Sequence, residues 1–546
     1  MTIAYALGPQ QPALLEQTIG ANLRAIAAEH GGRPALVSRH QGVRLTYAEL
    51  DAQVDGVARG LLAAGIAVGD RVGIWSPNCA EWTLLQYATA RIGAILFNLN
   101  PAYRTSELAY ALRQSGARLL VAPRSFKSSD YAGMVETVAP GLDTLERVVW
   151  VGEPSWDELV AGGADVGDDA LADRERQLSP TDPINIQYTS GTTGAQKGAT
   201  LSHRNILNNG FLVGEGCRYT TADRVCIPVP FYHCFGMVMG NLGATTHGAC
   251  MVIPAPAFDP GATLAAVAEE RCTSLYGVPT MFIAELDHPD FATFDLTSLR
   301  TGIMAGSPCP VEVMKRVIKD MHMEEVTICY GMTETSPVST QTAADDRLDK
   351  RVGTVGRVHP HLEIKVADPA TGETCVTGDT GEFCTRGYSV MLGYWNDPER
   401  TAEVLDADGW MHTGDLATMD DEGYANIVGR IKDMIIRGGE NVYPRELEEF
   451  LYGHPDIADV QVIGVPDSLY GEELMAWVIL RPGSALTPEE VREHCRGAVA
   501  HFKVPRYVKV VADFPMTVTG KVQKYRLREL AVEELGLEAA ANVRTA

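Results

Sequence analysis

Helix-like and strand-like stretches alternate along most of this chain. From about Leu45 to residue 345, amphipathic text such as TYAELDAQVDGVARGLLAAG is followed by short β-branched runs such as RVGIWSP and ARLLVAP. This alternation is typical of βα units, in which helices connect the parallel strands of a sheet. At 546 residues the chain is too long for one compact core, so we expect at least two domains. The sequence therefore predicts an α/β fold with several lobes.

The pattern changes after about residue 345. Segments such as HLEIKVADPATGE and GYANIVGR are rich in strand formers and punctuated by glycine, which indicates an antiparallel sheet or small barrel. A fresh helix is expected at Pro444, because proline is favoured in a first turn. We predict a large N-terminal domain, residues 1–431, with parallel sheets and a small β-rich subdomain, and a small α+β C-terminal domain, residues 432–546. The short connection predicts that the C-terminal domain is mobile.

Composition excludes several classes of partner. The chain has 70 acidic and 46 basic residues, a net charge of −24, so we expect no nucleic-acid partner and no attraction to anionic membranes. The 11 cysteines contain no C-x-x-C pair and no zinc-like spacing, which predicts reduced, mostly buried thiols. The most apolar zone, roughly Cys226 to Phe258, is too interrupted for a membrane helix. With no basic residue before Arg24, we expect a soluble cytoplasmic protein without an integral membrane segment.

A glycine- and hydroxyl-rich segment follows the apolar run that ends at Tyr188. The string YTSGTTGAQKG, residues 188–198, contains no acid and has one lysine, Lys197, near its end. Small residues let backbone N–H groups converge on an anion, and a lysine adds a point charge suited to phosphate. The spacing fits neither a P-loop nor a Rossmann fingerprint, and an exposed turn is the alternative. The predicted phosphate-binding residues are Thr189, Ser190, Gly191, Thr192, Thr193, Gly194 and Lys197.

The chain resembles the adenylate-forming superfamily, which includes acyl-CoA synthetases, peptide-synthetase adenylation domains and luciferases. The segment 188–198 is similar to its phosphate-binding signature. Its other signatures recur in order as YGMTETSP (330–337), TGD (413–415), GRIKDMIIRGGENVYP (429–444) and TGKVQK (519–524). One departure is Gln196, where the family usually has proline before the lysine. Because the motifs span nearly the whole chain, the resemblance implies ATP-dependent activation of a carboxylic acid.

The resemblance implies a nucleotide site built from four segments. Glu334 is expected to bind Mg²⁺ and Thr333 to contact the α-phosphate, although a glutamate at a helix start is also favoured by the helix dipole. Asp415 and Arg430 are expected at the ribose, where an Asx-turn is the alternative role for the aspartate. The implied adenine pocket consists of Gly306, Ser307, Pro308 and Tyr330. On its own, Tyr330 would be interpreted as a core residue.

The C-terminal motifs imply a second half-reaction. Lys521 resembles the lysine that contacts the carboxylate and the α-phosphate during adenylation. Lys432 falls at the family's hinge, and Gly438 and Gly439 would border the pantetheine arm of CoA after a domain rotation. Residues 503–528 hold seven basic residues against one acid, which indicates either a rim facing ATP or CoA or a solvated charged surface.

The acyl pocket is implied by PFYHCFGM, residues 230–237, in which His233 would position the carboxylate. Gly331 stands where acetate-activating relatives carry tryptophan, so we expect depth for a longer chain. The strings VMLGYW and AHFKVPRY resemble the medium-chain fatty acyl-CoA synthetase branch most. Aryl or branched acids, and delivery to a carrier protein, are left open.

We therefore predict an AMP-forming acid–thiol ligase. Its catalytic residues are expected to be Lys521, Glu334, Thr333 and His233, with ATP, CoA and a carboxylic acid as substrates and Mg²⁺ as cofactor. A luciferase-like oxygenase has no positive support in the sequence. A non-catalytic adenylate sensor would be expected to lose Lys521 or Glu334, and both are present. The oligomeric state is left open, with a homodimer as one option.

Overall fold

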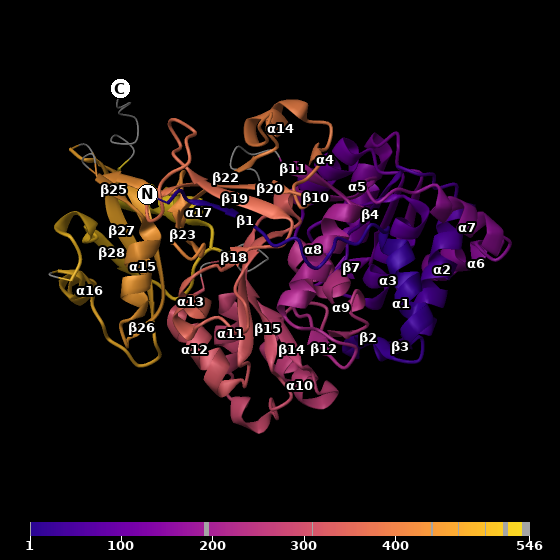
Figure 1. Ribbon diagram of the computed structural model, residues 1–546, viewed down its shortest axis with the longest axis horizontal. Coiled ribbons are helices and arrows are strands. Elements are labelled where there is room, and N and C mark those ends of the chain that lie inside the picture. Colours follow the sequence, from indigo (N-terminus) through magenta and orange to yellow (C-terminus); the bar gives the residue numbers. More distant parts are fainter. Residues whose placement is uncertain are drawn as a thin grey trace.

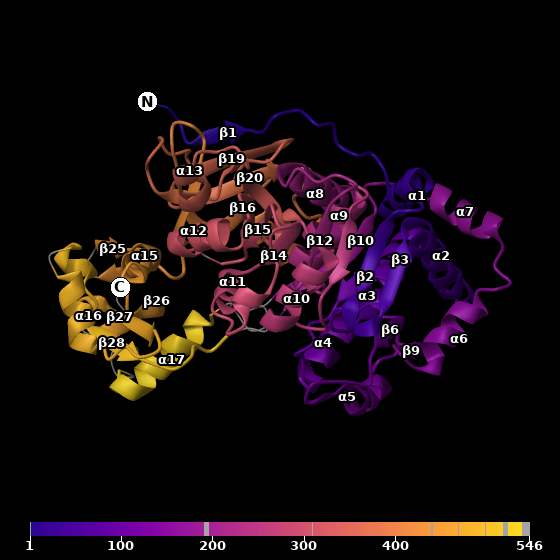
Figure 2. The ribbon, with the colours of Figure 1, turned by 90° about the horizontal axis from the view of Figure 1, so that it is seen from below.

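The computed structural model describes residues 2–189, 196–307, 309–437, 440–467, 469–496, 498–516 and 522–537. Figures 1 and 2 show a large body that contains the earlier elements and a smaller C-terminal unit at one end of the long axis. No helix among the described residues is long and apolar enough to cross a membrane.

Two mostly parallel sheets form the centre of the large body. The first has the order β18 (Arg357–Val358), β17 (Val338–Gln341), β16 (Glu325–Gly331), β15 (Thr301–Ala305), β14 (Ser274–Gly277), β12 (Arg224–Cys226), β13 (Cys250–Ile253), β2 (Pro34–Ser38) and β3 (Val43–Thr46). The second has the order β21 (Gly393–Tyr394), β11 (Lys197–Ser202), β10 (Pro183–Thr189), β5 (Ile95–Asn98), β4 (Arg71–Ile74), β6 (Leu119–Ala122) and β9 (Arg147–Trp150). In the second sheet, β11 is antiparallel to β10, and Lys197 pairs with Thr189.

Helices cover these sheets, as the alternation of helix-like and strand-like stretches predicts (Figure 1). They are α1 (Ile19–His30), α2 (Tyr47–Ala63), α3 (Ala80–Ile92), α4 (Thr105–Ser115), α5 (Tyr131–Val138), α6 (Pro154–Gly162), α7 (Asp168–Arg176), α8 (His203–Gly216), α9 (Gly243–Thr245), α10 (Pro260–Glu270), α11 (Pro279–Leu286), α12 (Val311–Asp320), α13 (Leu348–Gly353) and α14 (Pro398–Val404). A small hairpin of β7 (Ser125–Phe126) and β8 (Ser129–Asp130) precedes α5.

Helix α2 illustrates why the sequence folds this way. Thr46 and Glu49 form a capping box that satisfies free backbone N–H groups at its start. Leu50, Val54 and Leu61 recur at helical spacing and are buried, so one stripe of the helix faces the core.

The β-rich subdomain is an antiparallel sheet of β1 (Tyr5–Leu7), β19 (Leu362–Ala367), β20 (Gly381–Gly387), β22 (Met411–Met419) and β23 (Ala425–Arg430). The predicted β-rich subdomain after residue 345 is therefore confirmed. The N-terminal strand β1 was not predicted. It joins this sheet by pairing with β19, more than 350 residues away in sequence, and such distant pairing leaves no local sequence signal (Figures 1 and 2).

The C-terminal unit has a sheet of its own. Its strands are β24 (Ile435–Arg437), β25 (Glu440–Val442), β26 (Ile457–Asp467), β27 (Gly471–Leu480) and β28 (Tyr507–Val510), and its helices are α15 (Pro444–Tyr452), α16 (Pro488–Cys495) and α17 (Lys524–Leu535). Helix α15 begins at Pro444 as predicted. The fold class, α/β with a β-rich subdomain and a small α+β unit, is confirmed by these sheets.

Candidate active site

Asp415 lies at the centre of one group of predicted residues. It stands on β22, and strand register pairs it with Arg430 on β23. The Nε atom of Arg430 lies 2.9 Å from Oδ1 of Asp415, and the hydroxyl of Tyr330 donates a 2.8 Å hydrogen bond to Oδ2. The Asp415 side chain is only 8% exposed, so this carboxylate is oriented by two partners before any ligand arrives. A carboxylate held in this way suits a diol such as ribose.

Tyr330 also connects this group to the predicted adenine segment. Strands β15 and β16 are parallel, with Ala305 opposite Cys329, so Gly306 follows beside Tyr330. Gly306 has a φ of +92°, a conformation that favours glycine. Burial, with the neighbouring Asp415 charge, raises the pKa of Tyr330, so its hydroxyl stays a donor. Pro308 lies outside the described residues.

Glu334 forms the second group. It lies in a single turn of 3₁₀ helix, η5 (Thr333–Thr335), and is 5% exposed. Its carboxylate Oε1 accepts a 2.8 Å hydrogen bond from the hydroxyl of Tyr394, and its backbone carbonyl accepts one from the Met391 N–H. Burial and the Glu334 charge raise the pKa of Tyr394, so the phenol remains protonated and donates. Thr333, the predicted α-phosphate contact, is 8% exposed in the same turn.

The ends of the predicted phosphate loop lie beside Tyr394. Thr189 closes β10 and pairs with Lys197, which opens β11. The Lys197 ammonium lies 5.0 Å from the centroid of the Tyr394 ring, a cation–π contact. Ser190, Gly191, Thr192, Thr193 and Gly194 lie outside the described residues. The structure thus brings Lys197 over the ring of Tyr394 and Glu334 to the hydroxyl of the same side chain.

His233 precedes a buried π-helix, η3 (Phe235–Leu242). Its Nδ1 accepts a 3.2 Å hydrogen bond from the Phe235 N–H, which assigns that nitrogen an acceptor role. Burial, with a contribution from the Glu334 charge, raises the pKa of the adjacent Cys234 thiol. An α-helix widened to a π-turn is often found where a chain shapes a binding site. The acyl-pocket role of His233 stays a prediction.

Gly331 has a backbone reason to be glycine. A Cβ atom at this position would lie 1.8 Å from the Pro337 carbonyl oxygen and 3.0 Å from the Ser339 nitrogen. The side-chain direction therefore points at the neighbouring backbone, which approaches at the bulge between β16 and β17. Pocket depth, the role predicted from the sequence, is not needed to explain this glycine and stays a prediction.

The sequence matches two family descriptions, AMP-binding enzyme over residues 23–395 and AMP-binding enzyme C-terminal domain over residues 446–521. The chain belongs to the AMP-binding enzyme family. YngI of Bacillus subtilis (strain 168), named as an acyl-CoA synthetase, is 47% identical over 96% of this chain and 99% of its own length. The mitochondrial medium-chain acyl-CoA ligase ACSF2 of Danio rerio is 44% identical over 98% of this chain and 92% of its own. ATP-bound MatB from Rhodopseudomonas palustris has a similar structure, with a TM-score of 0.84, 32% identity and coverage of 95% and 99%. The predicted family is confirmed.

The sequence analysis of this AMP-binding enzyme missed Tyr394, which contacts the predicted site residues Lys197 and Glu334. Its string VMLGYW was noticed as a family mark, but no role was assigned to the tyrosine. The antiparallel pairing of β21 with β11 brings it into contact with both Lys197 and Glu334. No local sequence signal carries that pairing, because β21 is only two residues long.

The hinge and CoA residues are only partly described. Lys432 is exposed and follows β23, next to Ile431, whose N–H donates to the Gly414 carbonyl. The predicted hinge residue therefore directly follows Ile431, whose backbone is hydrogen-bonded to Gly414, the residue before Asp415 on β22. Gly438, Gly439 and Lys521 lie outside the described residues, so their roles stay predictions.

The basic residues in the segment 503–528 of this AMP-binding enzyme form ion pairs within the C-terminal unit. Each described basic residue between 503 and 528 contacts an acid: Lys503 with Glu446, Arg506 with Asp467, Lys509 with Glu534, Lys524 with Glu448, Arg526 with Glu529, and Arg528 with Glu472. Of the two interpretations of this segment, a solvated charged surface fits these side chains better than a surface that faces ATP or CoA, because nearby acids compensate their charge.

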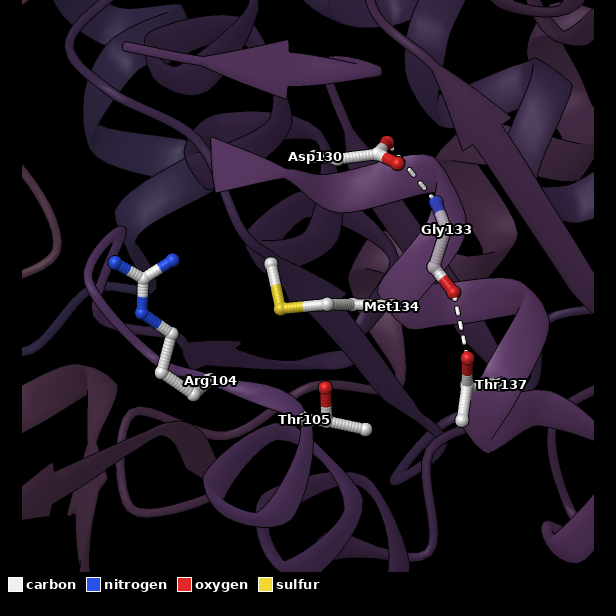
Figure 3. Close-up of a pocket in the computed structure, with 6 residues that line it drawn as sticks. All are labelled: Arg104, Thr105, Asp130, Gly133, Met134 and Thr137. Carbon is white, nitrogen blue, oxygen red and sulfur yellow. Dashed lines mark hydrogen bonds between the residues drawn. The ribbon is translucent and has the colours of Figure 1, made fainter. Parts of the chain in front are cut away.

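A pocket of about 390 Å³ lies elsewhere, between the starts of α4 and α5 (Figure 3). Its lining residues are Arg104, Thr105, Asp130, Gly133, Met134 and Thr137. Asp130 accepts from the Gly133 N–H at 3.0 Å, and Thr137 donates to the Gly133 carbonyl at 2.8 Å. These polar groups serve the first turn of α5, and no predicted site residue lines this pocket.

Proposed function

We propose that this protein joins a carboxylic acid to CoA in two steps, with cleavage of ATP to AMP and pyrophosphate. The carboxylate attacks the α-phosphorus, pyrophosphate leaves, and the acyl adenylate then loses AMP to the CoA thiol. One observation supports this most: the nucleotide-binding residues of four separate motifs converge, with Tyr330, Asp415 and Arg430 in direct contact. The relatives named as acyl-CoA synthetase and acyl-CoA ligase support the same class of enzyme.

The residues of the chain supply alignment and charge stabilisation in this proposal. Asp415 and Arg430 orient the ribose, and Tyr330 fixes the Asp415 carboxylate from the other side. Lys197 and Lys521 offset negative charge on the phosphates. His233 orients the acid. We assign no side-chain nucleophile, because the acid and the thiol are themselves the nucleophiles.

Magnesium is part of the proposal. Glu334 has a buried carboxylate, and Thr333 of the same turn has a hydroxyl group; such oxygen donors suit a hard cation. When bound, Mg²⁺ would supply charge neutralisation of the ATP phosphates. Tyr394 holds the Glu334 carboxylate in one orientation, so the protein contributes the geometry of that ligand.

We propose a medium-chain fatty acid as the substrate. The resemblance of VMLGYW and AHFKVPRY to that branch, and the name of the ACSF2 relatives, medium-chain acyl-CoA ligase, support the assignment. We also propose a domain boundary at residues 431 and 432. The last sheet contains only strands after Arg430, and the two family matches lie on opposite sides of this boundary. A cytoplasmic location and a homodimer stay expectations; the ACSF2 relatives are named as mitochondrial.

A pyrophosphate-release assay tests the function. Purified protein is supplied with ATP, Mg²⁺ and acids from acetate to palmitate, together with benzoate, with and without CoA. We expect AMP and pyrophosphate with medium-chain acids and a thioester only when CoA is present. Release that requires a carrier protein would contradict the CoA assignment, and a preference for benzoate would contradict the fatty-acid assignment.

A further inference from the structure

Three side chains of metal-ligating type meet on the β-rich subdomain. Glu382 and Cys384 are two residues apart on β20, and such residues point to the same face of a strand. Strand register places His412 of β22 opposite Cys384. One donor atom from each of the three side chains lies within 4.8 Å of the other two. These residues are absent from the motifs that define the nucleotide site.

The distances suit a small tetrahedral ion. Nδ1 of His412 lies 2.8 Å from Oε2 of Glu382 and 3.6 Å from Sγ of Cys384. A tetrahedral ion with metal–ligand bonds of about 2.0 to 2.3 Å separates its ligand atoms by roughly 3 to 4 Å. A small outward shift of the Glu382 carboxylate therefore leaves room for an ion between the three atoms.

A second observation, independent of the cluster, concerns the other ring nitrogen. Nε2 of His412 lies 3.5 Å from Oδ2 of Asp406. The Asp406 carboxylate is itself fixed, because Oδ1 accepts from the N–H groups of Asp408 and Trp410 at 2.9 Å. A metal-bound histidine usually donates its remaining N–H to a carboxylate, which frees the first nitrogen for the metal. Asp406 provides this support.

We propose that Glu382, Cys384 and His412 form a binding site for one thiophilic divalent cation of the Zn²⁺ class. The sulfur, nitrogen and oxygen donors select such an ion over Mg²⁺, which prefers oxygen ligands alone. The His412 side chain is 32% exposed and the Glu382 side chain 13% exposed, so the ion has a path from solvent and water can complete its coordination.

Binding requires a change of protonation at the sulfur. Burial and the Glu382 charge raise the pKa of the Cys384 thiol to about 12, so the thiol is protonated without a metal. The cation takes the place of that proton, which is released to solvent, while His412 binds as the neutral ring with its proton on Nε2. Sequence spacing gives no hint of this site, because strand pairing and not a C-x-x-C repeat brings the ligands together.

The proposed cation site lies beside Asp415, the residue that we predict to bind ribose. Between the positions opposite Glu382 and Cys384, β22 bulges and presents Thr413, Gly414 and Asp415. Oε1 of Glu382 accepts a 2.9 Å hydrogen bond from the Gly414 N–H. The Glu382 carboxylate therefore contacts both the Gly414 N–H, next to Asp415, and the proposed ion, so a change at Glu382 could also alter nucleotide binding. For this reason metal binding is measured without nucleotide, acid or CoA. Its outcome is then independent of the proposed function.

The test uses the full-length reduced protein and Co²⁺ as the probe. We expect one equivalent to give a thiolate-to-cobalt absorption band in the near ultraviolet, together with tetrahedral visible bands that Zn²⁺ abolishes. Cys384→Ser should lose the thiolate band, and His412→Gln should weaken Co²⁺ binding at least tenfold. Asp406→Asn, which leaves all three ligands, should weaken it about tenfold. This variant keeps the test informative if Cys384→Ser fails to fold.

Two matched controls separate this site from other donors. Cys375→Ser removes the partly exposed cysteine of the same subdomain and should keep the band. Glu334→Gln removes the carboxylate of the magnesium proposal and should also keep it. A wild-type protein without a thiolate band, or a band that persists in a folded Cys384→Ser variant, would overturn the proposal.

Discussion

The hydroxyl of Tyr394 donates a 2.8 Å hydrogen bond to the carboxylate of Glu334, while the Lys197 ammonium lies over the same ring. The tyrosine is held there by backbone bonds. Its neighbours Leu392 and Trp395 donate N–H groups to the carbonyls of Thr200 and Gly198 on β11. One aromatic side chain therefore contacts both a cation and an anion that the sequence analysis predicted to bind the phosphates and Mg²⁺.

Removing the Tyr394 hydroxyl should loosen the Glu334 carboxylate. A hydrogen bond to a charged group contributes about 1.5 to 3 kcal/mol, so Tyr394→Phe is expected to lower kcat/KM for adenylation roughly tenfold to a hundredfold. The apparent affinity for Mg²⁺ should fall as well, while KM for the acid stays unchanged. Adenylation rates measured across a Mg²⁺ series check this. Tyr424→Phe is the matched control, because it removes a hydroxyl bonded to Asp346 away from Glu334 and should be near wild type.

Asp415 should be responsible for recognition of the ribose hydroxyls. Asp415→Asn keeps the size of the side chain but halves its acceptor capacity, so KM for ATP is expected to rise roughly tenfold or more. KM for 2′,3′-dideoxy-ATP should hardly change, and the preference for ATP should shrink. Competition kinetics with the two nucleotides measure this. An equal loss for both nucleotides would show that Asp415 acts through folding, and the exposed Asp421→Asn serves as control.

Lys521 should act in one half-reaction only. Lys521→Ala is expected to abolish adenylation while thioester formation from supplied acyl adenylate continues, since a domain rotation would remove this lysine between the steps. The control comes from the same motif: Lys524 is bonded to Glu448 at 2.6 Å within the C-terminal unit. Lys524→Ala should lower thermal stability and spare the ratio of the two rates. Equal loss of both steps in Lys521→Ala would contradict the rotation.

Glu285 should make the fold less stable at high pH. It is 1% exposed on α11, and neither carboxylate oxygen has a hydrogen-bond partner among the described residues. Burial raises the pKa of Glu285 well above its usual value. In the unfolded chain it ionises above about pH 4.3, so its contribution to stability falls by up to about 1.4 kcal/mol per pH unit above that point, until the folded pKa is reached.

Glu285→Met should therefore stabilise the protein, and more strongly at pH 8 than at pH 5. Denaturant unfolding at several pH values measures the difference. Glu136→Met, an exposed glutamate of α5, is the control and should show no such slope. A pH-independent difference between Glu285→Met and wild type would mean that Glu285 binds the same number of protons in the folded and unfolded chain, which would contradict a raised folded-state pKa.

The local chemistry of the chain was predictable from its sequence. Helix α2, with its capping box and apolar stripe, and helix α15, with Pro444 in its first turn, follow from short-range rules. The phosphate-binding role predicted for the segment from Thr189 to Lys197 likewise rests on a contiguous run of small residues. The strings around Glu334 and Asp415 carried the family resemblance because each is contiguous.

Tertiary structure alone decided which of these segments meet. The Tyr394 contact with Glu334 spans 60 residues, the Tyr330 contact with Asp415 spans 85, and β1 joins a strand over 350 residues away. The His412 cluster depends on a strand register with a bulge, and a shift of one residue would turn its side chains to the other face. Sequence specifies residue types at short range, whereas the register of distant strands depends on the packing of the whole sheet, and that packing has no local signature.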